Sequence, residues 1–172
     1  MAFCAPKQLS FFLPRIVDQL KDILTDAQPK VAESGIKALG SIGSVAQNPE
    51  VAEISNSLIN ALKDPEHGLK HSLDVLLKTN FTHLIDAPSL SLLIPVLYNG
   101  LFSQNSHNNI NAAVVVGHIC ELIQQPQDLI PYLGIIMPAL RATLFSADPQ
   151  VRGTAALAVG SLSKGLGLSN SD

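Results

Sequence analysis

The sequence lacks the excess of positive charge that strong binding to nucleic acids or membranes requires. It has 11 lysine and arginine residues against 14 aspartate and glutamate residues in 172, a formal net charge of −3. Such a chain has little electrostatic attraction to phosphates or anionic lipids. No run approaches the roughly 20 apolar residues of a transmembrane helix, and the short apolar run Ser10–Leu13 is followed by Pro14 rather than by a signal-peptide cleavage pattern. We therefore expect a cytoplasmic protein with no membrane partner and no strong intrinsic binding of nucleic acids.

Cysteine and aromatic residues are also scarce. The two cysteines, Cys4 and Cys120, lie far apart, and we interpret both as reduced, small apolar residues on helix faces. Tryptophan is absent and only 5% of residues are aromatic, while 47% are hydrophobic. A composition in which leucine, isoleucine, valine and alanine supply the apolar surface favours helices packed on helices.

Residues 137–162 show a pattern that predicts two helices joined by a short turn. Asp148 is a typical N-cap, and Pro149 suits the first position of the second helix. On each helix, apolar residues recur every three or four positions and define one apolar face: Ala139, Leu140, Leu144 and Phe145 on the first, and Val151, Ala155, Ala158, Val159 and Leu162 on the second. Neither helix can bury that face alone, so neighbouring units of the same kind are required.

The same pattern occurs three more times. Leucines at the expected ends of the first helices, Leu24, Leu62, Leu101 and Leu144, are separated by 38, 39 and 43 residues. Two helices per unit and a period near 40 are typical of HEAT repeats, and the internal prolines Pro14, Pro95 and Pro138 suit first helices that are kinked. The sequence predicts an all-α fold, a right-handed α-solenoid of about four HEAT-type two-helix repeats. We assign one array over residues 1–172, with approximate units 8–46, 49–80, 86–124 and 126–166.

The two ends of the chain lack the polar capping units that close most solenoids. Residues 1–6 are apolar and similar to the tail of a preceding repeat, and no further unit follows Leu166. We expect the chain to be a segment of a longer array, with neighbouring HEAT repeats as partners.

One stretch, Leu76–Pro95, closely resembles the central, elongation-factor-three-like HEAT region of the general control translational activator family. Residues Ala38–Glu50 and Ala158–Gly167 are similar to the same region, and Phe81–Pro95 is the most distinctive part. The HEAT domain of fungal elongation factor three is a more distant relative that shares an element like Asp86-Ala-Pro88.

The resemblance implies a non-catalytic scaffold whose full-length parent has two partners, the ribosome and a regulatory kinase. That kinase acts on the alpha subunit of translation initiation factor two and is activated in amino-acid starvation. In the family the kinase contact lies beyond the position of Asp172. Relatives usually carry basic residues where this chain has Gln104–Asn111, so a contact with ribosomal RNA is not implied there. Two alternatives stay open: the HEAT regulatory domain of an elongation-factor-three-like ATPase, and an unrelated α-solenoid adaptor or transport receptor.

No group of side chains predicts an enzyme active site or a cofactor site. His67, His71, Asp74 and Lys78 fall on one helical stripe, which we interpret as a solvated face rather than a metal site because the neighbouring leucines take the opposite side. We expect His83 and His118, which lie among apolar residues, to be hydrogen-bonded packing residues. Nucleophile-elbow and P-loop motifs are absent. We therefore predict no catalytic, cofactor-binding or metal-binding residues.

Basic residues are the remaining candidates for partner binding. They form two groups, one in the second unit and one in the fourth: Lys63, Lys70 and Lys78, and then Arg141, Arg152 and Lys164. Acidic residues interleave with the first group, so strong phosphate binding is not expected. We expect Arg152 to donate hydrogen bonds to turns of adjacent repeats.

Overall fold

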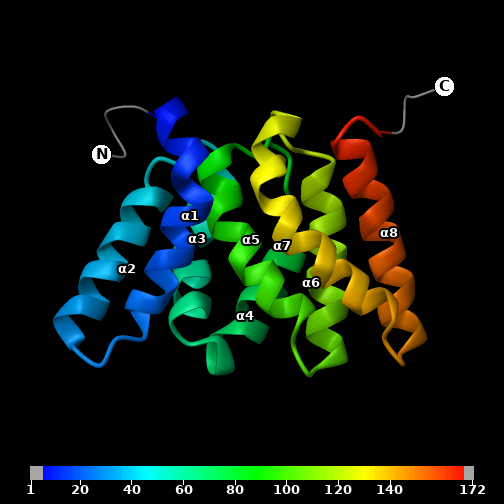
Figure 1. Ribbon diagram of the computed structural model, residues 1–172, viewed down its shortest axis with the longest axis horizontal. Coiled ribbons are helices and arrows are strands. Elements are labelled where there is room, and N and C mark those ends of the chain that lie inside the picture. Colours follow the sequence, from blue (N-terminus) through cyan, green and yellow to red (C-terminus); the bar gives the residue numbers. More distant parts are fainter. Residues whose placement is uncertain (1–5, 169–172) are drawn as a thin grey trace.

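The computed structural model describes residues 6–168, with residues 6–11 described through their backbone alone. This part of the chain forms eight α-helices in four pairs (Figure 1). In chain order the pairs are α1 (Pro6–Leu24) and α2 (Pro29–Gly43), α3 (Pro49–Lys63) and α4 (Pro65–Lys78), α5 (Ala87–Leu101) and α6 (Ser106–Cys120), and α7 (Pro126–Leu144) and α8 (Pro149–Gly165). The predicted all-α arrangement of two-helix repeats is confirmed. Cys4 and the other residues before Pro6 lie outside the described residues.

Proline and polar caps define most of the helix starts. Among the helices from α2 to α8, all but α6 have proline at one of their first two positions, where the missing N–H costs no hydrogen bond. The Asp148 carboxylate accepts a hydrogen bond from the Gln150 backbone N–H at 2.8 Å, which confirms its predicted role as N-cap of α8. These local signals explain why the sequence pattern located the helix pairs.

Helix α5 lies at the centre of the molecule. It packs against α1, α2, α3, α4, α6 and α7 (Figure 1), and its leucines at 90, 92, 93 and 97 are fully buried. The low number of charges in its sequence follows from this position, because a helix enclosed on nearly all sides must be apolar all round.

The row of first helices departs from a regular solenoid, in which each repeat contacts only its neighbours. Helix α1 contacts α3 but also packs against α5 and α7, from the third and fourth repeats. In Figure 1, α1 lies in front of α3 and beside α5. The first repeat therefore folds over the second and encloses space between α1, α5 and α7.

Three details differ from the expectations drawn from the sequence. Phe145 is 78% exposed because α7 ends at Leu144, before the chain turns away from the core. Leu77, one of the leucines expected on the side of α4 opposite the histidine stripe and therefore buried, is 40% exposed. Residues 126–132, which precede the helix pair expected over residues 137–162, form the first two turns of α7, since Pro126 begins the helix and Tyr132 is buried.

Within residues 6–168, no helix is both long enough and apolar enough to cross a membrane.

Candidate functional site

The connector between α4 and α5, residues 79–86, is the longest between helices in the described part of the chain. It contacts the turn before α7 on one side and the start of α3 on the other. At its end, the Ile85 N–H donates to the Leu122 carbonyl at 2.7 Å, and the Gln124 N–H donates to the Ile85 carbonyl at 2.9 Å. This short parallel bridge fastens the connector to the turn that precedes α7. The other side of the connector is held by the start of α3.

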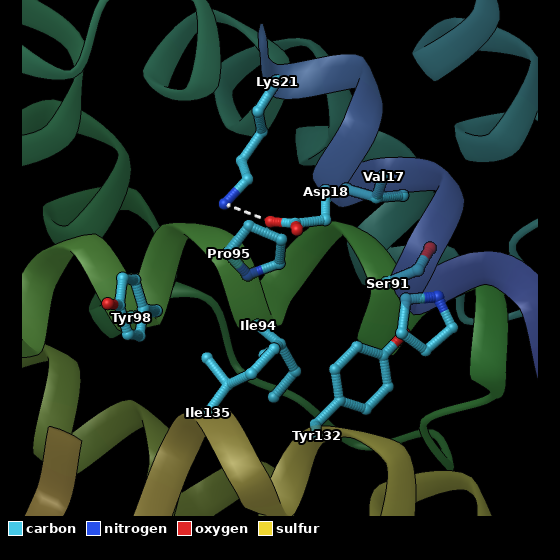
Figure 2. A pocket seen from close by; sticks show the side chains of 10 residues that line it. Val17, Asp18, Lys21, Ser91, Ile94, Pro95, Tyr98, Tyr132 and Ile135 are labelled. Carbon is cyan, nitrogen blue, oxygen red and sulfur yellow. Dashed lines mark ion pairs between the residues drawn. The ribbon is translucent and has the colours of Figure 1, made fainter. Parts of the chain in front are cut away.

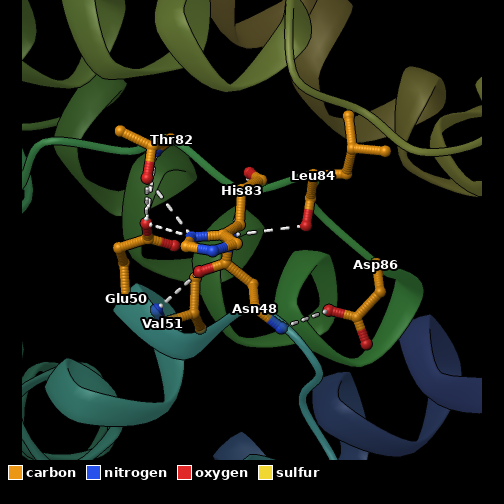
Figure 3. A network of polar contacts seen from close by, with 7 residues as sticks. All are labelled: Asn48, Glu50, Val51, Thr82, His83, Leu84 and Asp86. Carbon is orange, nitrogen blue, oxygen red and sulfur yellow. Dashed lines mark hydrogen bonds and ion pairs between the residues drawn. The ribbon is translucent and has the colours of Figure 1, made fainter.

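Asn48 is the first of the α3 residues that hold the connector (Figure 3). It is 1% exposed and is the N-cap of α3: its Oδ1 accepts from the Val51 N–H at 2.8 Å. Its Nδ2 donates to the His83 and Leu84 carbonyls at 3.1 and 3.3 Å. A single buried amide thus starts a helix of the second repeat and satisfies two carbonyls of the connector.

Glu50 holds the same connector from the first turn of α3 (Figure 3). Its Oε1 accepts from the Thr82 N–H at 3.2 Å, the Thr82 hydroxyl at 2.8 Å and His83 Nδ1 at 2.7 Å. Burial opposes its ionisation, but the hydrogen bonds from His83 and Thr82 outweigh burial and lower the pKa of Glu50 to about 2. Glu50 is therefore a carboxylate at neutral pH and accepts all three hydrogen bonds in that form.

Asp86 connects the beginning of α5 to the turn before α3. It is 5% exposed, and its carboxylate accepts from the Gln47 N–H at 3.1 Å, from the Asn48 N–H at 3.4 Å and from the Ser89 hydroxyl. It occupies the N-cap position of α5, yet accepts no hydrogen bond from the α5 backbone. Its charge also adds to the effect of burial in raising the pKa of Asp128 on α7.

These contacts hold the repeats together, and they offer no catalytic chemistry. His83 does form hydrogen bonds, but its side chain is 62% exposed, and His118 is exposed as well. The expectation that both are packing residues is therefore wrong. In α6, His118 lines the groove between α6 and α8 and stays exposed there, which apolar neighbours in the sequence could not reveal.

The histidine stripe of α4 is solvated in the structure. His67 and His71 are exposed, and His67 Nδ1 lies 2.9 Å from the carboxylate of its helix cap, Asp64. Asp74 instead accepts from Asn111 Nδ2 of α6 at 3.0 Å. Among the residues that the structure describes, no three histidine, cysteine or acidic side chains are grouped so that they could hold a metal ion.

All six basic residues proposed from the sequence are exposed, but they do not form one cluster: Lys63, Lys70, Lys78, Arg141, Arg152 and Lys164. Helix α6 packs between α4 and α8 and so separates the second-repeat group from the fourth-repeat group. Along α8 itself, Arg152 and Lys164 are about 18 Å apart.

Arg152 differs from the other five basic residues because its guanidinium donates hydrogen bonds within the protein. Its Nη1 donates to the Ser146 and Ala147 carbonyls at 2.8 and 2.9 Å. Both carbonyls belong to the turn between α7 and α8, within its own repeat. The expectation that Arg152 joins adjacent repeats is therefore wrong, and the residue stabilises the turn beside its own helix.

The asparagine-rich segment has a structural role that the sequence analysis missed. Asn109 Nδ2 donates to the carbonyls of Gly100, Leu101 and Ser103 at 2.9, 3.0 and 2.9 Å. It thereby satisfies carbonyls at the end of α5, which have no partner within the helix. The sequence did contain a signal for this role. Asn109 lies about one turn after the start of a helix that follows a short loop.

Comparisons with known proteins agree with this architecture. The family model described as "Elongation factor 3/GNC1 HEAT repeat" matches residues 66–172. The chain is 44% identical to Protein ILITYHIA of Arabidopsis thaliana over 99% of its length. It is 43% identical to the stalled ribosome sensor GCN1 of Homo sapiens over 97%, and 44% identical to the eIF-2-alpha kinase activator GCN1 of Dictyostelium discoideum over 99%.

Each of these relatives is far longer than the chain, which spans 6% of their length. The resemblance to the translational activator seen in the sequence is confirmed, since the similarity extends over nearly the whole chain rather than over Leu76–Pro95 alone. The family model covers more than half of the residues, among them Asp86 and the third and fourth repeats. The chain therefore belongs to the elongation factor 3/GNC1 HEAT repeat family.

Proposed function

We propose that the chain is a non-catalytic interaction scaffold, a HEAT segment of a cytoplasmic translational activator that binds ribosomes and promotes activation of the initiation factor two alpha kinase. The observation that carries the proposal is the similarity, over nearly the full chain, to relatives named as a stalled ribosome sensor and as a kinase activator. The kinase contact itself is proposed to lie beyond Asp172, as the family resemblance implies.

The structure supports a scaffold because its buried polar groups are used to hold repeats in fixed positions. Asn48 and Asp86 bind backbone groups of another repeat or connector, and Glu50 binds the same connector. A rigid array of this kind presents an extended surface to partners. The five exposed basic residues other than Arg152 make no ion pair within residues 12–168 and are the proposed contacts with ribosomal phosphates.

The test is a charge reversal in the full-length parent. Glutamate replaces the five basic residues whose side chains are not needed for a turn: Lys63, Lys70, Lys78, Arg141 and Lys164. The matched control reverses Lys30 and Lys37, exposed on α2 of the first repeat. Because phosphate contacts act through charge, we expect less parent in the ribosome pellet at low salt and less phosphorylation of the initiation factor in starved cells. The deficit in the pellet should narrow at higher salt, because salt weakens the same contacts in the unaltered parent.

The control should sediment as the unaltered parent does, and both variants should retain helical circular dichroism. Unchanged co-sedimentation together with unchanged kinase activation in the five-residue variant would refute a contribution of these residues.

A further inference from the structure

Thr82 lies in the middle of the connector between α4 and α5, on the surface of the molecule. Its side chain is exposed, and residues 79–86 lie outside the helices on either side of them. An exposed hydroxyl on a non-helical segment is the form in which serine/threonine protein kinases take their substrates. Exposure alone would not distinguish Thr82 from other surface hydroxyls, but the group that its hydroxyl contacts does.

The Thr82 hydroxyl is bonded differently from hydroxyls in other connectors. Those of Thr25, Ser44 and Thr79 donate to carbonyls of the helix that precedes them, at 3.1, 2.8 and 2.8 Å. The Thr82 hydroxyl instead donates to Oε1 of Glu50, on α3, at 2.8 Å (Figure 3). A change at this hydroxyl therefore acts on a contact between two elements that lie 32 positions apart in the sequence.

Glu50 depends on the donors that the connector supplies. Its side chain is 15% exposed, and it is a carboxylate at neutral pH because its pKa is lowered to about 2. Oε1 accepts from Thr82 and His83, while Oε2 is buried and has no hydrogen-bond partner among the described residues. A mostly buried charge with one unpaired oxygen is costly unless its remaining donors stay in place. The contact is thus sensitive to negative charge placed beside it.

We propose that Thr82 is a phosphorylation site and that its modification releases the connector from α3. In the reaction, Thr82 Oγ1 attacks the γ-phosphorus of a nucleoside triphosphate held by a serine/threonine protein kinase. The Oγ1–P bond forms, the bond from that phosphorus to the bridging oxygen breaks, and the nucleoside diphosphate leaves. The hydroxyl proton passes to a base of the kinase and then to water.

The phosphate replaces a hydrogen-bond donor by an anion. Oγ1 no longer carries a hydrogen for Glu50, and the new group brings a charge of about −1.5 to −2 next to a carboxylate. His83 Nδ1 lies 3.2 Å from Thr82 Oγ1 and 2.7 Å from Glu50 Oε1, but a single ring hydrogen can serve only one of the two anions. Repulsion therefore moves Thr82 away from Glu50, while Ile85 stays bonded to the Leu122 carbonyl.

The first test asks whether the parent carries the modification. Full-length parent is isolated from fed and from amino-acid-starved cells with phosphatase inhibitors present, and the peptide that spans residues 79–86 is analysed by mass spectrometry. We expect a fraction with one added phosphate, which fragment ions place on Thr82. Thr79 is the matched control within the same peptide, because its hydroxyl donates to a carbonyl of α4, and it should remain unmodified.

The second test measures the release in the 172-residue chain with phosphothreonine incorporated at residue 82. Amide hydrogen exchange, followed by NMR, reports the Thr82 N–H, which donates to Glu50 Oε1 at 3.2 Å. We expect this N–H to exchange at least about thirtyfold faster in the phosphorylated chain than in the unmodified one. The Ile85 N–H, which donates to the Leu122 carbonyl at 2.7 Å, should stay protected.

A cavity of about 220 Å³, where α1, α5 and α7 meet, provides an internal control (Figure 2). Tyr132 enters it from α7, and Val17, Ile94 and Ile135 form apolar parts of its wall (Figure 2). None of the residues that line it belongs to the connector or to α3. The methyl signals of Val17, Ile94 and Ile135 should therefore not move on phosphorylation, and shifts there would contradict a local release.

Variants separate the added charge from the lost hydrogen bond. Thr82→Val removes the hydroxyl without adding charge and should speed exchange at residue 82 about threefold, whereas Thr82→Glu adds a charge and should speed it at least about tenfold. Combined with Glu50→Gln, which removes the opposing charge, Thr82→Glu should exchange no faster than Glu50→Gln alone. Ser34→Glu is the matched control, because this exposed hydroxyl of α2 donates to a carbonyl of its own helix, and it should change nothing.

Two outcomes would overturn the inference. A parent peptide without phosphate on Thr82 under both conditions would remove the modification. Equal exchange in the phosphorylated chain and in the Thr82→Val chain would show that the charge does not release the connector. Both readouts are independent of whether the parent sediments with ribosomes.

Discussion

Replacing Asp86 by alanine removes a buried carboxylate that three donors from two repeats share. The donors are the Gln47 and Asn48 backbone N–H groups, 39 and 38 positions away in the sequence, and the Ser89 hydroxyl. Asn48 is buried, so its N–H would lose its partner without gaining water, whereas Gln47 is exposed and its N–H can be hydrated. The substitution therefore tests whether the junction between repeats contributes to stability.

The expected cost follows from these environments. A buried donor left without a partner costs about 1–3 kcal/mol, and each lost hydrogen bond to a charged group contributes a similar amount. Alanine also removes the free-energy cost of burying a charge, which offsets part of the loss. We expect Asp86→Ala to lower the free energy of unfolding by about 2–4 kcal/mol. Asp86→Asn should cost less, about 1–2 kcal/mol, because the amide oxygen of asparagine still accepts a hydrogen bond. A cost remains because its NH2 group faces a donor where the carboxylate had a second acceptor.

Urea denaturation of the chain, followed by circular dichroism, measures both effects. The matched control is Asp148→Ala, which removes an aspartate that caps only its own helix, through the Gln150 N–H, and should cost about 1 kcal/mol. If Asp86→Ala destabilises the chain no more than Asp148→Ala does, then Asp86 acts as an ordinary cap and the junction argument is wrong.

Further predictions concern single side chains. The pKa of Glu50 is lowered from 4.5 to about 2, so its contribution to stability is complete above pH 4.5 and is lost as the pH falls toward 2; Glu50→Gln should flatten the pH dependence of unfolding in that window. Gly165→Ala should destabilise the chain by about 1–3 kcal/mol in the urea assay, because the new methyl group would collide with the Cys120 carbonyl. Gly160→Ala should instead stabilise it by about 0.5–1 kcal/mol, because the space around a methyl group at residue 160 is open. Burial raises the pKa of Cys120 to about 12, and the charge of Glu121 adds to the effect. Alkylation of this thiol at pH 8, followed by peptide mass spectrometry, should therefore require unfolding. Rapid labelling of the folded chain would contradict its burial.

The sequence was sufficient for the features that depend on neighbours along the chain. Apolar residues every three or four positions predicted the helices, and aspartate followed by proline predicted the starts of α4 and α8, because capping acts within one turn. It was insufficient where the partner is distant. The carboxylate of Asp86 belongs at an N-cap by sequence, but its backbone donors come from the previous repeat, a pairing that no local pattern encodes.

Exposure was the other quantity that local patterns could not give. Whether His118 or Leu77 is covered depends on which neighbouring helix reaches that side, and therefore on how the repeats are stacked. The basic residues illustrate the same limit: each was correctly expected on the surface, but their separation by α6 follows only from the packing. Their role in partner binding stays a prediction.

The distinctive stretch Phe81–Pro95 combines the two parts of the molecule that the repeat pattern does not explain. Its first half, the connector, is held by Asn48 and Glu50 and ends at Asp86. Its second half is the beginning of α5, where Ile94 and Pro95 form one side of the cavity that Tyr132 enters from α7. A repeat needs only apolar periodicity to form its helices, whereas the junction and the cavity each need particular side chains at particular positions. This stretch therefore departs from generic repeat sequence for a physical reason, because its polar contacts join the start of α3, the start of α5 and the turn before α7.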